Sequence, residues 1–182
     1  SKWLKYSGNA DPTDVGSLGN IFEFYGFRFN VFMTYSFGNV IRLDPVFSNT
    51  YNDLDSMPKE FANRWTVPGD ENTTSVPAIA SVWQNRQDTH LSKAYNAYNY
   101  STERIARGDF IRMKEISIAY DVPLSLIKHI GLSSMSLKLQ GTNLFLIYSD
   151  KKLNGQDPEF MNSGGVAVPM ARQFTFTVRL GI

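Results

Sequence analysis

The fold is decided by the last stretch of the sequence, Arg172-Gln173-Phe174-Thr175-Phe176-Thr177-Val178-Arg179-Leu180-Gly181-Ile182. Apolar and polar side chains alternate through this stretch, and successive side chains of a strand point to opposite faces. One face would carry Phe174, Phe176, Val178, Leu180 and Ile182. The stretch also has the length, roughly 9–11 residues, that a tilted strand needs to cross a bilayer. We therefore predict a membrane-spanning strand whose five apolar residues face lipid.

The composition of the 182 residues is compatible with a β-barrel and excludes several other classes of protein. Hydrophobic residues make up 42% and charged residues 19%, which is not the composition of a disordered chain. The net charge is +1 without a dense basic patch, so no nucleic-acid partner is expected. The lack of cysteine excludes disulfides and thiolate metal sites. No apolar run approaches the roughly 20 residues of a membrane-spanning helix, whereas barrel strands alternate and keep the mean hydropathy ordinary.

The same alternation recurs in earlier parts of the chain. Further strands are expected at residues 20–24, 27–41, 109–120 and 135–148. A tight turn at Tyr25-Gly26 would join the first two as a hairpin. In the third, Ile111 and Met113 are out of phase with the apolar residues that follow, which predicts a β-bulge near Lys114-Glu115. The predicted fold class is all-β, with antiparallel transmembrane β-barrel strands.

Two long stretches, residues 44–107 and 149–171, show no strand periodicity. Loops of this length are uncommon in compact domains, whereas outer-membrane barrels combine long external loops with short periplasmic turns. Counting connections back from the last strand puts both stretches on the same side of the membrane, so we predict two external loops. Shorter features are expected at 8–18 (a loop), 53–64 and 94–104 (short helices), and 121–133 (a connection with a helical turn at 124–130).

Several segments together resemble the C-terminal part of the SusC/RagA-type TonB-dependent outer-membrane transporters. In chain order they are Gly8-Asn9-Ala10-Asp11-Pro12, Phe24-Tyr25-Gly26-Phe27, Arg64-Trp65-Thr66 with Pro68-Gly69, Gly108-Asp109-Phe110-Ile111-Arg112-Met113-Lys114-Glu115-Ile116-Ser117-Ile118-Ala119-Tyr120 followed by Pro123, Gly141-Thr142-Asn143-Leu144-Phe145, and Asp157-Pro158-Glu159. They occur in the order of the family and cover nearly the whole chain.

The resemblance implies a barrel of roughly 22 strands in the outer membrane of a Gram-negative bacterium. Residues 1–182 would supply about the last six strands, with the plug domain and the TonB-contacting segment absent from them. The remaining strands and the plug would come from the same precursor or from another chain. The family imports oligosaccharides or peptides, works with a SusD-like surface lipoprotein and takes its energy through TonB. No cofactor and no metal are implied.

Two groups of residues are candidates for ligand contact. Arg28, Lys138 and Arg179 alternate with apolar residues and would face the barrel lumen, together with Asn30, Gln140 and Thr175. Trp65 and Trp83 lie in the long loop, where an indole ring could stack on a sugar or pack within the loop. No His, Asp and Ser spacing indicates a catalytic site, so no enzyme is predicted. The oxygen-rich residues of 150–159 fail the EF-hand spacing, although a looser cation site stays open.

Two alternatives from other classes remain at this point. A soluble antiparallel β-sandwich that binds carbohydrate would bury its apolar faces against each other rather than against lipid. A related barrel could also act as a structural or assembly subunit without transport.

Overall fold

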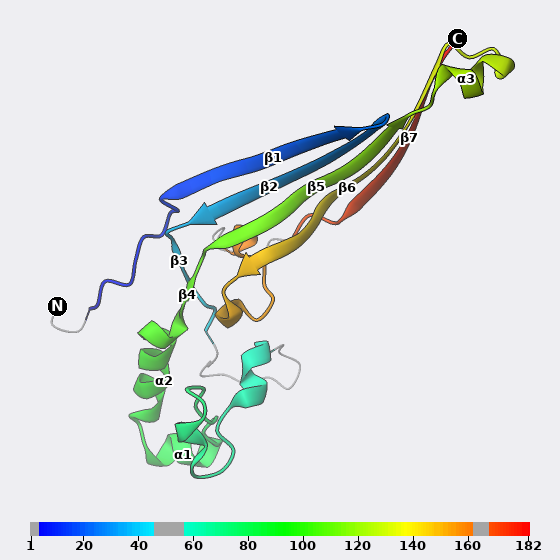
Figure 1. The fold of residues 1–182 in the computed structure, drawn as a ribbon. Coiled ribbons are helices and arrows are strands. Elements are labelled where there is room, and N and C mark those ends of the chain that lie inside the picture. Colours follow the sequence, from blue (N-terminus) through cyan, green and yellow to red (C-terminus); the bar gives the residue numbers. More distant parts are fainter. Residues whose placement is uncertain (1–3, 46–56, 162–167) are drawn as a thin grey trace.

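A single antiparallel sheet dominates the computed structural model, which describes residues 4–45, 57–161 and 168–182 (Figure 1). Its strand order is β1-β2-β5-β6-β7, so strands adjacent in the sheet follow one another along the chain. The bounds are β1 (Asp14–Phe24), β2 (Phe27–Phe37), β5 (Phe110–Asp121), β6 (Ser134–Ser149) and β7 (Gln173–Gly181). The expected all-β antiparallel class is confirmed, but the sheet has five strands rather than about six. Within the described residues β1 and β7 are its two edges, and no second sheet packs on it as a β-sandwich would require.

Strand β1 begins at Asp14, so the prediction that residues 8–18 form only a loop is wrong at its C-terminal end. Gly16 and Ser17 carry no apolar signal, yet they pair in register with Tyr35 and Thr34 of β2. A Cβ on Gly16 would lie 2.5 Å from the Tyr35 hydroxyl, so the ring covers this position. The strand is therefore specified by its partner rather than by its own alternation.

Strand β2 ends at Phe37, earlier than the predicted extension to Ile41. Gly38 follows with φ 90°, a left-handed conformation that glycine adopts readily. The Gly38 amide donates a hydrogen bond of 2.7 Å to Asp109 Oδ1. The chain then forms a separate two-stranded ladder, in which β3 (Val40–Arg42) pairs with β4 (Ile105–Arg107).

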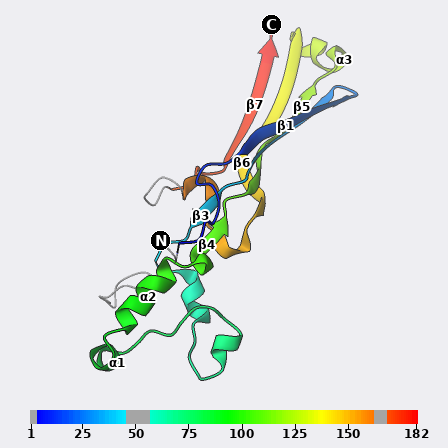
Figure 2. The ribbon, with the colours of Figure 1, turned by 90° about the vertical axis from the view of Figure 1, so that its left-hand side faces the viewer.

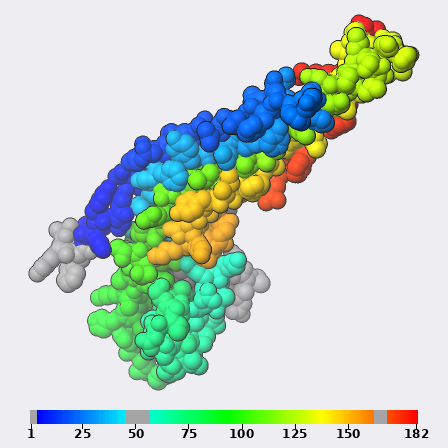
Figure 3. Space-filling model, viewed as in Figure 1, coloured from blue at the N-terminus to red at the C-terminus, as the bar shows by residue number. Residues whose placement is uncertain are grey.

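The short connections and the long ones lie at opposite ends of the sheet (Figures 1 and 2). At the first end, the turn end, Tyr25 (φ 46°) and Gly26 (φ 82°) form the two-residue hairpin turn, because a type I′ turn needs positive φ at both positions. Helix α3 (Leu124–Ile127) and the 3₁₀ turn η4 (Lys128–Ile130) occupy the same end, as predicted. Residues 57–107 and 150–161 lie at the other end, the loop end, where Figure 3 shows the long segment gathered into a body beside the elongated sheet.

The loop end contains only short helices. They are η1 (Lys59–Asn63), η2 (Asp70–Asn72), α1 (Val82–Gln87), α2 (Leu91–Asn99), η3 (Thr102–Arg104), η5 (Lys151–Leu153) and η6 (Pro158–Phe160). The helix predicted at 53–64 survives as η1, while residues 53–56 lie outside the described part of the chain. The helix predicted at 94–104 begins earlier and ends at Asn99, and α1 was not predicted. Among the described residues, no helix has the length and apolarity needed to span a membrane.

The predicted β-bulge is confirmed. The β2–β5 register pairs Phe32 with Glu115 and then Met33 with Met113, so Lys114 has no partner in β2. A strand slipped by one residue presents the opposite face. The extra residue therefore returns Met113 and Ile111 to the face that carries the other apolar side chains.

One face of the sheet, called the apolar face here, consists of hydrophobic residues aligned across all five strands. A single cross-strand row contains Phe22, Phe29, Ile118, Leu139 and Phe176. Every member of this row is exposed, from 39% for Phe29 to 65% for Phe176. The face is thus apolar and uncovered within the described chain, the reverse of a sheet that packs on a water-excluding core.

Buried apolar residues occur outside the five-stranded sheet. One cluster at the loop end joins Ile41, Leu43, Ala106 and Leu153. A second cluster centres on Val76, with Phe61, Tyr95 and Tyr98 packed against it. Within the sheet the buried residues are instead Ser36, Arg112, Ser117 and Gly141. The sheet is therefore inverted relative to a water-soluble fold, and the loop end is not.

Candidate ligand-binding surface

The face opposite the apolar one, called the polar face here, carries the residues predicted to line a lumen. One cross-strand row contains Glu23, Arg28, Ala119, Lys138 and Thr177, and the next contains Ile21, Asn30, Ser117, Gln140 and Thr175. Arg179 pairs with Ser136 one row further along. Period-2 alternation alone brings these side chains from β2, β5, β6 and β7 onto one surface.

Near the turn end this polar face contains a hollow of about 210 Å³. Its lining includes all three predicted cations, Arg28, Lys138 and Arg179, together with Asp121 and the hydroxyl residues Ser117, Ser136 and Thr177. Arg28 Nε donates to Glu23 at 2.7 Å, so its charge is partly neutralised. Lys138 and Arg179 have no ion pair with any described residue. The hollow therefore has a positive balance suited to carboxylates or other anionic groups.

A second polar cluster, at the loop end, fastens residues 150–161 to the sheet. Arg112 of β5 is 6% exposed and pairs with Asp157, and its Nε lies 3.0 Å from Glu159. Lys114, the bulge residue, pairs with Glu159 at 3.2 Å. Asp157 is also the N-cap of η6, where its Oδ1 accepts a 3.1 Å hydrogen bond from the Glu159 amide. A buried cation paired in this way fixes the loop, since removal of Arg112 would leave Asp157 without a counter-charge and Glu159 with Lys114 alone.

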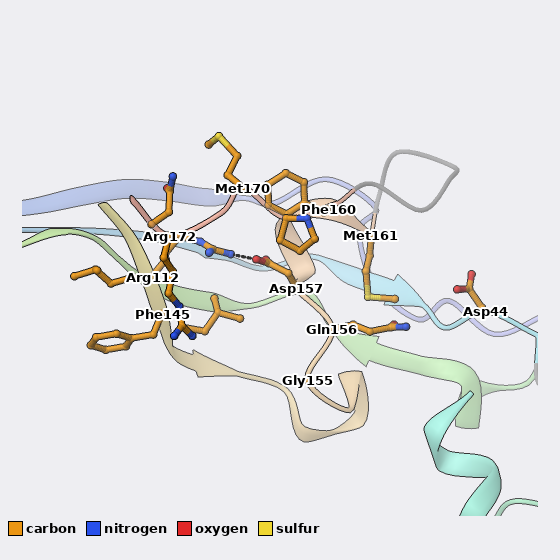
Figure 4. Close-up of a pocket in the computed structure, with 14 residues that line it drawn as sticks. Asp44, Arg112, Phe145, Gly155, Gln156, Asp157, Phe160, Met161, Met170 and Arg172 are labelled. Atoms are coloured by element: carbon orange, nitrogen blue, oxygen red, sulfur yellow. Dashed lines mark hydrogen bonds and ion pairs between the residues drawn. The ribbon is translucent and has the colours of Figure 1, made fainter. Parts of the chain in front are cut away.

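A cavity of about 630 Å³ lies beside this cluster (Figure 4). Its walls come from the β6 segment Asn143–Leu146, the segment 155–161, residues 169–172 and Asp44. Phe145 and Leu146 both line it although successive side chains of a strand point to opposite faces. The cavity therefore runs along an edge of β6. Among the described residues that edge has no strand partner, because β7 pairs with β6 only as far as Thr142.

The long loop is held by a second buried arginine. Arg104 is 2% exposed, donates to Glu60 at 2.5 Å and also donates to the main-chain carbonyl of Asp44. Its guanidinium carbon lies 5.9 Å from the centre of the Tyr98 ring. Burial raises the pKa of the Tyr98 hydroxyl above its usual value of 10.0, with Arg104 opposing this shift. The residues at the loop end are thus ordered by charged contacts as well as by the small apolar clusters.

The two predicted tryptophans lie in the long loop, at the opposite end from Arg28, Lys138 and Arg179. Trp65 is half-buried, and its indole Nε1 donates a 2.7 Å hydrogen bond to the Thr74 carbonyl. Trp83 of α1 is 69% exposed and lines a shallow hollow of about 270 Å³ with Tyr95. Trp65 therefore packs within the loop, and Trp83 is the one of the two with a free ring face.

The oxygen-rich segment 150–159 directs its carboxylates to protein partners. Asp150 accepts from the Arg107 amide at 2.8 Å and from the Lys152 amide at 2.9 Å. Asp157 and Glu159 pair with Arg112 and Lys114. Over the ranges that the structure describes, no cluster of three or more metal-ligating side chains occurs.

Three residues that line the loop-end cavity, Arg112, Asp44 and Arg172, were not predicted as site residues from the sequence. Arg112 sits in the middle of a predicted strand, and its partner Asp157 is 45 positions away. Asp44 is the first residue of the long predicted loop, and Arg172 is the first residue of the predicted last strand, directly after the second loop. One feature of the sequence could have indicated Arg112, because this arginine stands between the apolar residues Ile111 and Met113. A charged side chain in such a position needs a partner when it is buried.

An uncovered apolar face on a sheet with an opposite polar face is typical of the wall of a membrane barrel. No family model matches the sequence. The chain is 25% identical over 169 residues to TonB-dependent receptor P39 of Formosa agariphila, an alignment that covers 89% of this chain and 14% of the relative. The chain is therefore homologous to a short segment of a TonB-dependent receptor, as the sequence motifs predicted.

Experimentally determined structures agree on the fold. The RagAB peptide importer in its open-open state matches with a TM-score of 0.65 and 19% identity, over 98% of this chain and 18% of that chain. A second structure, of the RagAB peptide transporter, matches with a TM-score of 0.57 and 22% identity, over 90% of this chain and 16% of that chain. The five-stranded sheet thus has the fold of part of the RagA barrel.

Proposed function

We propose that this chain forms part of the barrel wall of a TonB-dependent importer in the outer membrane, which takes up oligosaccharides or peptides. The observation that carries the proposal is the exposed row Phe22, Phe29, Ile118, Leu139 and Phe176, aligned across five strands. Such a surface has low free energy only against hydrocarbon or a partner of similar apolarity. The residues on the same side of β7, namely Phe174, Phe176, Val178, Leu180 and Ile182, would then face lipid.

The two open edges of the sheet support closure by other strands. In hydrocarbon every backbone polar group must be paired within the protein, and for strands this requires a closed barrel. The free edges of β1 and β7 would therefore pair with the remaining strands of the receptor, to a total of roughly 22. The polar face would line the lumen, where Arg28, Lys138 and Arg179 would meet the plug or passing ligand.

The loop end would be the external side of the receptor. Its ordered residues, which include the exposed Trp83, are suited to contact a SusD-like surface lipoprotein and a ligand held between the two proteins. Energy would reach the site through TonB and the plug. This arrangement is non-covalent, which is consistent with the lack of cofactor-binding motifs in the sequence.

The lipid-facing assignment is tested with single cysteines, because the chain contains no cysteine of its own. Phe176→Cys and Thr177→Cys are made in the receptor that carries this chain, with any other cysteine removed, and each is labelled with bimane. In vesicles of brominated phosphatidylcholine, the label at 176 should be quenched strongly and the label at 177 weakly. Equal quenching at the two neighbouring positions would contradict the proposal.

Transport is tested separately in cells. Deleting the gene should abolish uptake of the nutrient, whereas a structural or assembly barrel would leave uptake intact and change the assembly of other outer-membrane proteins. The control in both cases is Phe176→Tyr, because this substitution keeps the apolar face.

A further inference from the structure

We propose that the loop-end cavity binds a short peptide by its two charged termini, with Arg172 receiving the carboxylate and Asp44 the ammonium group. This inference rests on the proposed import function and names the ligand class and the site. It arises from the distribution of charge around the cavity of about 630 Å³, a size within the range of small-ligand sites.

The cationic end of the cavity is Arg172. The neighbouring Arg112 already pairs with Asp157 and Glu159. No described carboxylate pairs with Arg172. A planar guanidinium that lacks a counter-ion at the rim of a cavity is suited to a carboxylate, which it can bind through two parallel hydrogen bonds.

The anionic end is Asp44. Its main-chain carbonyl accepts from the buried Arg104, which fixes the backbone at this position. Its carboxylate forms no ion pair within the described residues. Figure 4 shows Asp44 and Arg172 on opposite sides of the cavity, so one ligand can meet both charges only at its two ends.

The middle of the cavity is apolar and adjoins free backbone. Phe160, Met161 and Met170 lie between the two charged residues (Figure 4), and methionine side chains adapt to ligands of varied shape. Along one wall, β6 from Asn143 onward pairs with β5 alone among the described residues, so the main-chain groups on its other edge have no strand partner there. An extended peptide can pair with such an edge independently of its sequence.

Together these features favour a zwitterionic peptide over an oligosaccharide. A neutral sugar would leave Arg172 and Asp44 without counter-charges and would not use a strand edge. A peptide of a few residues with free termini satisfies the charges, the apolar middle and the edge at once.

The test measures binding of Ala-Leu-Phe-Ala to the intact receptor, purified in detergent with its lipoprotein partner, by isothermal titration calorimetry. Acetylating the amino terminus or amidating the carboxyl terminus should each weaken binding by about 10- to 100-fold, the effect of losing one charged hydrogen bond. A series from di- to pentapeptides should show a length optimum, since the termini must span the distance between the two residues.

Variants assign each terminus to its residue. In Arg172→Gln the affinity for the free peptide should fall to that of the amidated peptide, and amidation should have no further effect. In Asp44→Asn the same should hold for acetylation. Lys151→Gln and Asp11→Asn are matched controls, because they neutralise charges that do not line the cavity, and they should bind like the unmodified receptor.

The inference is overturned if blocked and free peptides bind equally. It is also overturned if maltotetraose competes with the free peptide and Arg172→Gln and Asp44→Asn bind maltotetraose as the unmodified receptor does. Either result would leave the proposed function standing when quenching at position 176 and cellular uptake are normal. Loss of both quenching and uptake would instead refute the proposed function itself.

Discussion

The sheet and the loop end follow opposite rules of burial. In the sheet the apolar rows are exposed, and the buried side chains include Arg112 and Ser117. At the loop end Leu153 and Ala106 are almost fully buried, as in any protein folded in water. A single chain can obey both rules if, as proposed above, hydrocarbon surrounds the strands and water surrounds the loops. The boundary between the two regions lies where β2 and β6 end and β5 begins.

The largest effect is expected from Arg112→Leu, which removes the cation that joins the sheet to the loop end. Asp157 would then lack its buried counter-charge, at a cost of about 3–5 kcal/mol, and Glu159 would keep only Lys114. Amide hydrogen exchange of residues 150–161 in the detergent-solubilised receptor should accelerate accordingly. Lys151→Leu is the control at an exposed position of the same loop, and equal exchange in the two variants would contradict the role given to Arg112.

The next effect tests the inversion of the sheet directly. Phe176→Arg should destabilise the folded receptor by about 2–4 kcal/mol if the side chain lies near the bilayer midplane. Thr177→Arg, one residue away on the polar face, should destabilise the receptor far less because its side chain points away from the lipid. Heat-modifiable mobility on gels after refolding into vesicles measures the folded fraction, and a reversed order of the two variants would refute the assignment of faces.

A smaller effect is expected within the loop end. Ser81 caps α1 through a capping box, in which its Oγ accepts from the Gln84 amide at 3.2 Å and the Gln84 side chain accepts from the Ser81 amide at 2.8 Å. Ser81→Ala should cost about 1 kcal/mol locally. Hydrogen exchange of residues 82–88 should report it, whereas Ser81→Asp should retain most of the protection.

The smallest effect concerns a turn that depends on pH. The Asp70 carboxylate accepts hydrogen bonds from the amides of Val67 and Thr66 and from the Thr66 hydroxyl, and these hold its pKa below the ordinary 3.8. A lowered pKa stabilises the folded turn above pH 3.8, and this contribution is lost as the pH falls through the folded-state value. Amide shifts of residues 66–70 should therefore differ between Asp70→Asn and the unmodified protein at pH 7 and converge in acid.

The sequence predicts the sheet better than the loop end, for a physical reason. Alternation is a local property, so the faces of β7 and the bulge at Lys114 were both correct from residue order alone. The start of β1 was missed because Gly16 contributes no side chain, and its strand conformation depends on Tyr35 of the neighbouring strand.

The loop-end surface could not be predicted because its contacts join distant segments. The Arg112–Asp157 pair and the Arg104–Glu60 pair span 45 and 44 positions, and nothing in the local pattern relates their members. By contrast, alternation alone brought Arg28, Lys138 and Arg179 to one hollow. Whether they contact ligand stays a prediction.

The bulge at Lys114 has a consequence for how such a wall can vary in length. Successive side chains of a strand alternate between its two faces, so one inserted or deleted residue exchanges the faces of every residue beyond it unless a β-bulge absorbs the change. Deleting Lys114 would remove the bulge while Glu115 and Met113 keep their partners Phe32 and Met33, so Met113 would stay on the apolar face. A single residue can therefore be gained or lost at the bulge without exchanging the two faces, whereas the same change in a regularly paired part of the strand would exchange them.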